Sequence, residues 1–424
     1  MRCFPRLSHR LACAALVAGM GLLSGCQTVA TAADPRNLPA DREVVSPSYT
    51  VWLAELRQEA LAQGIRAATF DAAMAEAQIR DRVLELDQAQ PEFTRPVWVY
   101  LDNAISGKRV REGQERLARH AALLQRTAAS TGVPPEILVA FWGIETDYGR
   151  QTGGFAVLDA LTTLAWKGRR AQMFRKELLA ALKILDAGDV ARERMTGSWA
   201  GAMGQTQFMP SVYLAHATDA DQDHRRDIWG SLADVFASTA GYLVASGWRS
   251  GESWGEEVRL PPGFPWDQVE PTLSKPLSEW RRLGVRSVAD APLAEGPPAA
   301  LLAPAGHAGP VFLVRDNFRV IMRYNPATSY ALAVALLSDQ MKGRNHGVVA
   351  PWPRHEPPLS RSTLIALQEN LARLGYDAGS PDGVMGPTTR AALRQYQIQK
   401  AMIADGFPSR AVLEQIARDA GASL

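Results

Sequence analysis

The chain has 424 residues, and its 46 Lys and Arg face 44 Asp and Glu, which gives a formal net charge of +2 at pH 7. This near balance provides no basic excess for nucleic-acid binding. The length is enough for two or three domains, each able to bury a core.

The N-terminus has the pattern of a signal peptide. Arginines at positions 2, 6 and 10 precede an apolar run from Leu11 to Leu23, which is too short for a permanent membrane-spanning helix. We therefore expect residues 1–25 to be removed. Without them, 43 basic residues face 44 acidic ones, so the mature chain has a formal charge of −1.

The end of this leader predicts a lipid anchor. Leu-Ser-Gly-Cys at 23–26 matches the bacterial lipobox, so cleavage before Cys26 would leave a lipid-bearing cysteine. Because Gln27 follows it, we expect release to the periplasmic face of the outer membrane. An ordinary leader cleaved between residues 28 and 33 is the alternative. Cys26 is the only mature cysteine, so no intramolecular disulfide can form.

Proline content divides the rest of the chain. Residues 26–48 predict a tether, and 49–343 predict a mainly α-helical domain. Residues 344–360 contain four prolines and predict a stiff linker before a compact module at 361–424.

Apolar spacing places the helices of the large domain. The ranges with the clearest helical period are 49–77, 117–124, 134–144, 173–185, 232–247 and 330–341. Gly247 suits the end of the fifth helix. Prolines interrupt the period between residues 260 and 310, and Val311–Val314 follows as a strand. We expect a small inserted sheet, with loops, in this stretch.

The helix that begins near residue 134 carries a candidate acid. Pro134 and Pro135 suit a first helical turn, whose N–H groups have no partner to lose. Glu145 falls on the apolar side of this helix, where burial would raise its pKa and fit it to be a general acid. The alternative is a glutamate that reaches solvent at the helix end. The apolar side comprises Ile137, Leu138, Phe141 and Ile144.

A second segment, residues 198–211, has the composition of a sugar-binding loop. Ser198, Gln205 and Gln207 supply uncharged hydrogen-bonding groups beside the apolar ring of Phe208. A glycine-rich turn packed on a core helix would explain the small residues in this segment. It would not explain the two glutamines.

These segments resemble motifs of the lytic murein transglycosylase B family, bacterial enzymes that cleave peptidoglycan. Residues 143–149 read Gly-Ile-Glu-Thr-Asp-Tyr-Gly, and the second segment reads Ser-Trp-Ala-Gly-Ala-Met-Gly-Gln-Thr-Gln-Phe-Met-Pro-Ser. Further matches at 160–165, 169–170 and 324–330 extend the resemblance over roughly residues 49–343. The resemblance implies a lysozyme-like helical catalytic domain.

The resemblance also implies the reaction, which cleaves the β-1,4 bond between N-acetylmuramic acid and N-acetylglucosamine. Glu145 would protonate the leaving oxygen and then take the proton of the C6 hydroxyl, leaving a 1,6-anhydromuramoyl end without using water. A hydrolase needs two carboxylates at the bond, and Asp147 points roughly 200° round the helix from Glu145. A hydrolytic muramidase and a non-catalytic wall-binding lipoprotein are the alternatives. No organic cofactor is implied.

The family pattern implies a set of glycan-binding side chains. The two arginines among them would meet muropeptide carboxylates, although adjacent arginines also occur on solvated surfaces. The two outer tyrosines of the 324–330 motif could equally be core aromatics. The expected substrate-binding residues are Arg169, Arg170, Ser198, Gln207, Phe208, Tyr242, Tyr324, Asn325 and Tyr330.

Residues 219–225 contain aspartates at positions 1, 3 and 5, as in an EF-hand loop. The loop departs from that pattern with His224 in place of glycine and Gly230 in place of glutamate. The resemblance implies a shortened loop that holds a structural calcium or sodium ion. A solvated loop paired with its own arginines is the alternative. The candidate ligands are Asp219, Asp221, Asp223, the carbonyl of Arg225 and Asp234.

Residues 361–424 resemble the small peptidoglycan-binding domain of wall hydrolases. Leu-Gln-x-x-Leu-x-x-Leu-Gly-Tyr at 367–376 and Asp-Gly-x-x-Gly-x-x-Thr at 382–389 carry the resemblance. We expect three helices, with a packing module as the alternative to a binding one. The implied partners are peptidoglycan glycan strands, the membrane through the lipid anchor, and proteins of wall synthesis or division.

Overall fold

The structure is a computed structural model, and it describes residues 48–88, 95–343 and 347–422. The predicted leader, the lipobox and most of the tether lie outside the described residues. Tyr49–Leu424 forms one compact unit. No helix in the described part of the chain has the length and apolar character that a bilayer crossing needs.

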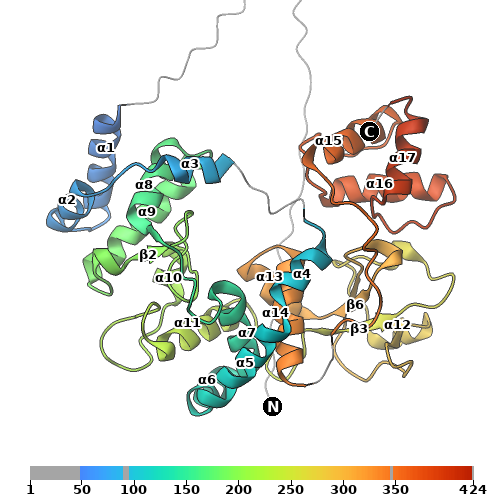
Figure 1. Cartoon of the computed structure of the whole chain (residues 1–424), viewed down its shortest axis with the longest axis horizontal. Coiled ribbons are helices and arrows are strands. Elements are labelled where there is room, and N and C mark those ends of the chain that lie inside the picture. The colour runs from blue at the N-terminus through green and yellow to red at the C-terminus, as the bar shows by residue number, and fades with distance from the viewer. Residues whose placement is uncertain (1–47, 89–94, 344–346, 423–424) are drawn as a thin grey trace, which may run out of the picture. The chain divides into compact units, whose positions relative to one another are not determined.

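The fold is mainly α-helical with two small sheets, as predicted (Figure 1). The helices are α1 Tyr49–Ala62, α2 Ala67–Ala75, α3 Asp81–Gln88, α4 Val97–Ala104, α5 Gly107–Arg119, α6 Ala121–Thr131, α7 Pro135–Thr146, α8 Val157–Lys167, α9 Ala171–Ala187, α10 Pro210–His216, α11 Leu232–Ala245, α12 Leu277–Arg282, α13 Asp316–Tyr324, α14 Thr328–Met341, α15 Arg361–Arg373, α16 Pro387–Gln399 and α17 Arg410–Asp419. The strands are β1 Phe155–Ala156, β2 Thr196–Gly197, β3 Gly255–Arg259, β4 Arg286–Ser287, β5 Ala300–Leu302 and β6 Val311–Val314.

Two apolar cores hold most helices of the large domain, residues 49–343. One core contains α7 and α14, which are buried along most of their length. The other is centred on α8 and α9, which lie side by side in Figure 1. Tyr242 and Tyr324 pack against both cores. These two rings therefore mark the seam between the cores.

The predicted insertion is a four-stranded antiparallel sheet in the order β4-β3-β6-β5. The strand predicted at 311–314 is confirmed as β6. Trp280 of α12 is fully buried against the sheet and donates its indole N–H to the carbonyl of Ala299 at 2.8 Å. The sheet begins with β3, before the proline-rich stretch, and α13 follows β6 where the sequence predicted no helix.

One helix prediction was wrong. Residues 117–124 do not form a single helix, because α5 ends and α6 begins on either side of His120. The imidazole ring of His120 packs edge-on against Trp142 at 6.1 Å and lies 6.5 Å from Phe236. Gly247, by contrast, lies one residue beyond the cap of α11 with φ +92°, a backbone conformation that favours glycine.

The C-terminal module is the predicted three-helix unit, with its own core between α15, α16 and α17. Gln368 organises its glycine-rich turn. The amide nitrogen of Gln368 donates to Asp382 Oδ1 at 3.0 Å, and its amide oxygen accepts from the N–H of Gly383 at 2.9 Å. These glutamine and glycine positions are those of the sequence motif.

The proline-rich segment after α14 is fastened to the large domain. The carboxylate of Glu257 accepts the N–H groups of Val349 and Ala350, both at 2.8 Å. The ring of Trp352 lies 6.1 Å from that of Trp98. The segment is therefore an attached strap and does not behave as a free spacer.

Candidate active site

Glu145 occupies the last turn of α7, at the edge of a fully packed helix. Nine residues of α7 are buried, so the carboxylate emerges from an apolar wall. The hydroxyl of Tyr330, on α14, donates to Glu145 Oε1. Burial raises the pKa of Glu145 to about 7, although the hydrogen bond from Tyr330 acts in the opposite direction. The carboxyl group therefore keeps its proton to a higher pH than an ordinary glutamate does.

An aromatic cluster surrounds this carboxyl group. The Tyr324 ring stacks parallel to that of Tyr330 at 6.5 Å, lies 4.7 Å from Phe141 and lies 5.0 Å from Tyr242. Burial raises the pKa of Tyr330 well above its usual value, and the neighbouring Glu145 adds to that effect. Both tyrosines of the 324–330 motif therefore pack as aromatics and present neutral hydroxyl groups.

The Ser198–Ser211 segment is held to α7 by its first glutamine. Gln205 accepts the indole N–H of Trp142 at 2.7 Å and donates to the carbonyl of Trp229 at 2.8 Å. The hydroxyl of Tyr324 donates to the carbonyl of Thr206. The sequence argument named Gln207 as a substrate ligand and did not foresee that Gln205 would support the loop.

Ser198, Gln207 and Phe208 all lie in this segment. Ser198 Oγ accepts the N–H groups of Ala200 and Ala202 at 3.3 and 3.1 Å, which shapes the turn. Gln207 has φ +51°, and its amide nitrogen donates to two backbone carbonyls. The amide oxygen of Gln207 accepts no hydrogen bond from a described residue. That oxygen is the group with which Gln207 could meet a sugar.

The remaining predicted ligands hold the scaffold. Arg169 donates its backbone N–H to Asp87 Oδ2 at 3.1 Å and its guanidinium to the Asp87 carbonyl. The Arg170 guanidinium lies 5.3 Å from the ring centre of Phe174. Asn325 Oδ1 accepts an N–H at the start of α14 at 3.1 Å. Neither arginine contacts Glu145 in the described structure.

Asp147 has the opposite environment to Glu145. Its backbone is left-handed at φ +51°, and its carboxylate lies 2.7 Å from Arg150 Nη2 and 3.4 Å from Arg109 Nη2. Burial would raise the pKa of Asp147, but the Arg150 and Arg109 guanidinium groups outweigh it and leave that pKa below its usual value. Asp147 is an ion-pair partner, and it caps the C-terminal end of α7 instead of lying on the helix as the sequence argument assumed.

Tyr100 was missed by the sequence argument. It lies on α4 and lines an open pocket of about 220 Å³ with Ile144, the neighbour of the candidate acid. The Tyr100 phenol is also close enough to act on the pKa of Tyr330. Tyr100 belongs to none of the motifs, so no local pattern pointed to it.

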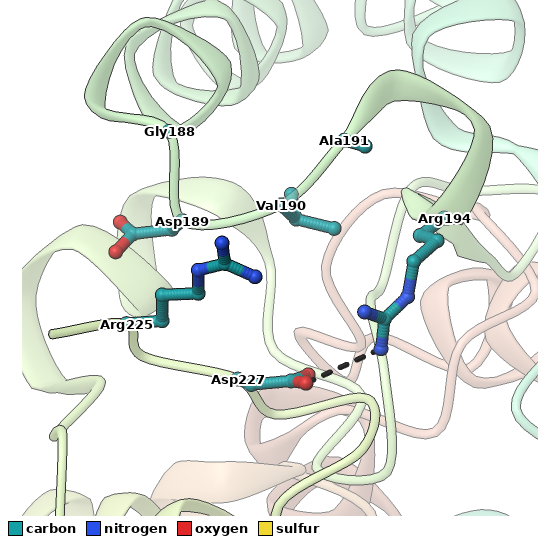
Figure 2. A pocket seen from close by; sticks show the side chains of 7 residues that line it. All are labelled: Gly188, Asp189, Val190, Ala191, Arg194, Arg225 and Asp227. Carbon is teal, nitrogen blue, oxygen red and sulfur yellow. Dashed lines mark hydrogen bonds and ion pairs between the residues drawn. The ribbon is translucent and has the colours of Figure 1, made fainter. Parts of the chain in front are cut away.

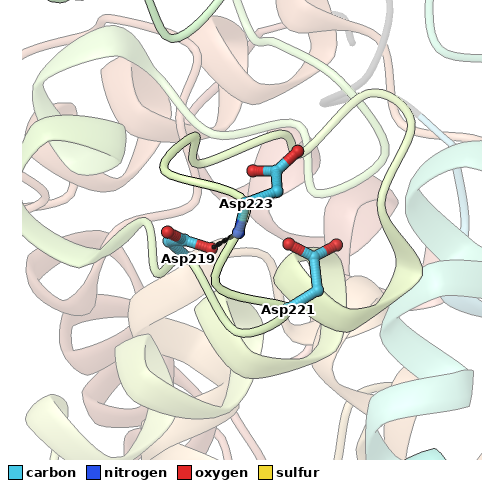
Figure 3. A group of neighbouring side chains, drawn as sticks. All are labelled: Asp219, Asp221 and Asp223. Atoms are coloured by element: carbon cyan, nitrogen blue, oxygen red, sulfur yellow. Dashed lines mark hydrogen bonds between the residues drawn. The ribbon is translucent and has the colours of Figure 1, made fainter.

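The acidic loop gathers its first three aspartates (Figure 3). Carboxylate oxygens of Asp219, Asp221 and Asp223 lie within 4.8 Å of one another. His224 has φ +69° at the position where an EF-hand has glycine. Asp234 is fully buried, and its two oxygens accept backbone N–H groups at both ends of the loop, each at 2.7 Å.

A polar pocket of about 240 Å³ adjoins this loop at the end of α9 (Figure 2). The Arg225 side chain points into it, while Arg194 Nη2 pairs with Asp227 at 3.2 Å. Two acidic and two basic side chains line the pocket, so its charges balance without a ligand. Neither Glu145 nor the aromatic cluster lines this pocket.

Comparison with known proteins gives the relatives of this fold. Residues 48–339 match the family model described as a transglycosylase SLT domain, and residues 360–416 match a putative peptidoglycan binding domain. The membrane-bound lytic murein transglycosylase B of Escherichia coli K12 is 32% identical over 277 residues, which is 62% of this chain and 74% of that protein.

Two solved structures are similar over much of the chain. SltB3 from Pseudomonas aeruginosa, in complex with NAG-anhNAM-pentapeptide, is 50% identical with a TM-score of 0.85, covering 87% of this chain and 99% of that one. The lytic transglycosylase Slt35 of Escherichia coli, in complex with calcium, is 30% identical with a TM-score of 0.60, covering 69% and 93%.

Proposed function

The chain belongs to the transglycosylase SLT domain family, and from that premise we propose that Glu145 is its single catalytic acid and base. The protein is a lytic transglycosylase of peptidoglycan with a C-terminal peptidoglycan-binding domain. The family and the activity predicted from the sequence are thereby confirmed. The observation that carries the assignment of Glu145 is its part-buried carboxyl group, which holds a proton near neutral pH.

In this proposal the protonated Glu145 donates its proton to the glycosidic oxygen as the bond to C1 breaks. The resulting carboxylate then accepts the proton of the C6 hydroxyl, whose oxygen closes on C1. The Tyr330 hydroxyl donates to Glu145 and stabilises the ionised form between these two steps. Asp147 is held by Arg150 and Arg109, which supports a mechanism with one carboxylate.

The mass of the products tests this function. Purified sacculi digested with the protein are expected to release muropeptides with 1,6-anhydro ends, each lighter by one water than a hydrolysed end. Glu145→Gln should release none above background. Products that carry a full water would support a hydrolytic muramidase instead.

We further propose that the acidic loop binds a structural cation, with Asp219, Asp221 and Asp223 as its ligands. Three carboxylates with oxygens within 4.8 Å of one another suit calcium, which prefers oxygen ligands. The Arg225 carbonyl is a candidate further ligand, whereas both oxygens of Asp234 already bind the loop backbone. A bound cation would relieve repulsion among the carboxylates and stiffen the loop.

Melting curves test the cation. Calcium is expected to raise the melting temperature, because only the folded loop binds it. The triple Asp→Asn variant of the three ligands should lose that response. If the parent melts at the same temperature in calcium and in chelator, the loop is a solvated one.

For localisation, we propose that lipid on Cys26 holds the protein at the periplasmic face of the outer membrane. The lipobox at 23–26 supports this, as does the similarity to a transglycosylase described as membrane-bound. Cys26→Ala should abolish palmitate labelling and release the protein from outer-membrane fractions. Unchanged fractionation and labelling would rule the anchor out.

A further inference from the structure

A second pocket lies where the C-terminal module meets the start of α4, and its volume is about 220 Å³. None of the described side chains that line it is acidic. Apolar walls with only positive charge suit a ligand that has a small apolar body and an anionic end. The side chains that matter are Trp98, Leu364, Met385, Phe407, Arg95 and Arg390.

Arg390 is the unusual member of this set. Its side chain runs beside Gly406, where an added Cβ would lie 2.7 Å from Arg390 Cγ. Its guanidinium makes no hydrogen bond or ion pair with a described residue. Burial lowers the pKa of Arg390, and the positive charge of Arg394 adds to that effect. Arg390 is partly buried where it lines the pocket, so an anion supplied by a ligand would give its partly desolvated guanidinium a hydrogen-bonding partner.

Glu270 and Asp405 are close enough to Arg390 to oppose this lowering of its pKa, but both carboxylates already hydrogen-bond to other side chains. Glu270 lies 2.8 Å from Arg394, one turn further along α16. Asp405 lies 2.6 Å from His307 Nδ1 and accepts from Gln397 at 2.8 Å. The Arg394–Glu270 and Asp405–His307 pairs also join the module to the loops of the inserted sheet. Arg390 itself makes no hydrogen bond to either carboxylate in the described structure.

We propose that this pocket binds the free carboxylate end of a peptidoglycan peptide stem, an inference that rests on the lytic transglycosylase function. A guanidinium fork matches a carboxylate with two parallel hydrogen bonds. Trp98, Phe407 and Met385 would cover the methyl groups of terminal alanines. A neutral sugar ring would leave Arg390 without a counter-charge, so the peptide fits this pocket better than the glycan does.

Arg95 is shared by this pocket and a second one. It lines both the Arg390 pocket and the pocket formed by Tyr100 and Ile144, the residue next to Glu145 in the sequence. In this proposal a peptide stem on a strand bound at Glu145 extends past Arg95 to Arg390. The consequence is a preference for strands whose stems end in a free carboxylate over strands whose stems are cross-linked through that end.

Binding of the stem alone tests the pocket. Isothermal titration of the full mature chain would compare a synthetic stem pentapeptide with the same peptide capped as a C-terminal carboxamide. A charge-assisted pair predicts that the parent binds the free acid on the order of 10-fold more tightly. Arg390→Met keeps the aliphatic stem and should bind both peptides equally, whereas Arg390→Lys should recover part of the preference.

Arg373→Met is the matched control, since Arg373 lies on the same module and its guanidinium donates to Asn370. This variant should keep the parental preference. The proposed role of the pocket would be overturned if the parent bound the free-acid and carboxamide peptides equally. It would also be overturned if the preference for the free acid survived Arg390→Met. The readout is binding, so a parent that releases no anhydro products would count against the proposed function and not against this pocket.

Discussion

Two carboxylates at the end of α7, one in its last turn and one at its C-cap, occupy opposite environments only two residues apart. Glu145 lies against Phe141 and Tyr330 in an apolar seam, and its pKa is raised to about 7. Asp147 lies between two guanidinium groups, and its pKa is lowered. The end of the helix and the left-handed backbone of Asp147 separate the two side chains, and the neighbours of each then set its pKa. Identical functional groups thus become an acid and an ion-pair partner.

The sharpest way to test this difference is Glu145→Gln. The amide keeps the size of the side chain but cannot donate and then accept a proton. General acid–base help is worth roughly 10²–10⁴-fold, and one residue serves both steps here. We therefore expect the turnover of sacculi to fall by at least the upper part of that range, as measured by release of anhydro-muropeptides. Near-parental turnover would remove Glu145 from the mechanism.

The same substitution should stabilise the fold, because ionised Glu145 is disfavoured by burial. A folded pKa of about 7 against an unfolded value near 4.5 means that stability falls as the pH rises between these values and stays low above them. Removing the group should recover up to roughly 3 kcal/mol above pH 7. Melting curves of parent and variant should therefore diverge at pH 8 and agree near pH 4. A variant that is less stable at pH 8 would contradict the raised pKa.

Tyr330→Phe tests the hydrogen bond that lowers the pKa of Glu145 and so opposes the effect of burial. Without it the pKa of Glu145 should rise further, so the alkaline limb of the pH–rate profile should move to higher pH. The loss of a hydrogen bond to a charged intermediate predicts about a 10-fold lower kcat. The profile separates this role from simple packing, because a packing defect would lower the rate without moving the limb.

Asp147→Asn should have the smallest effect. Asparagine tolerates the left-handed backbone at this position, so the variant removes the charge with little change in geometry. Activity should stay within a few-fold of the parent, and the loss of stability should be about 1 kcal/mol or less, as for other partly exposed ion pairs. An inactive but folded Asp147→Asn would mean that two carboxylates act at the bond.

The position of Glu145 on the apolar side of a helix could be predicted from the sequence, whereas most of its surroundings could not. The prolines at 134 and 135 and the apolar spacing after them are local signals, and α7 begins and ends close to where they indicate. The bond between Glu145 and Tyr330 joins residues 185 positions apart. This hydrogen bond forms because α14 packs on α7, and no local sequence pattern indicates that packing.

The wrong and missing elements have the same physical origin. The apolar spacing of 117–124 continues through His120, but contacts of its ring with Trp142 and Phe236 fix a break in the backbone there. Gln205 and Gln207 look equivalent in the sequence. Tertiary contacts place the Gln205 amide between Trp142 and Trp229, and it hydrogen-bonds to both. The amide oxygen of Gln207 makes no hydrogen bond to a described residue.

The strap after α14 fixes the distance between the C-terminal module and the catalytic domain. A module on a flexible spacer samples many distances from its catalytic domain, and its effective concentration falls as the spacer lengthens. Here Glu257 holds the strap, and the Arg394–Glu270 pair holds the module itself. The distance between the C-terminal module and the proposed catalytic residue, Glu145, is therefore set by the fold, so a strand bound by the module would be cut at a fixed distance from it.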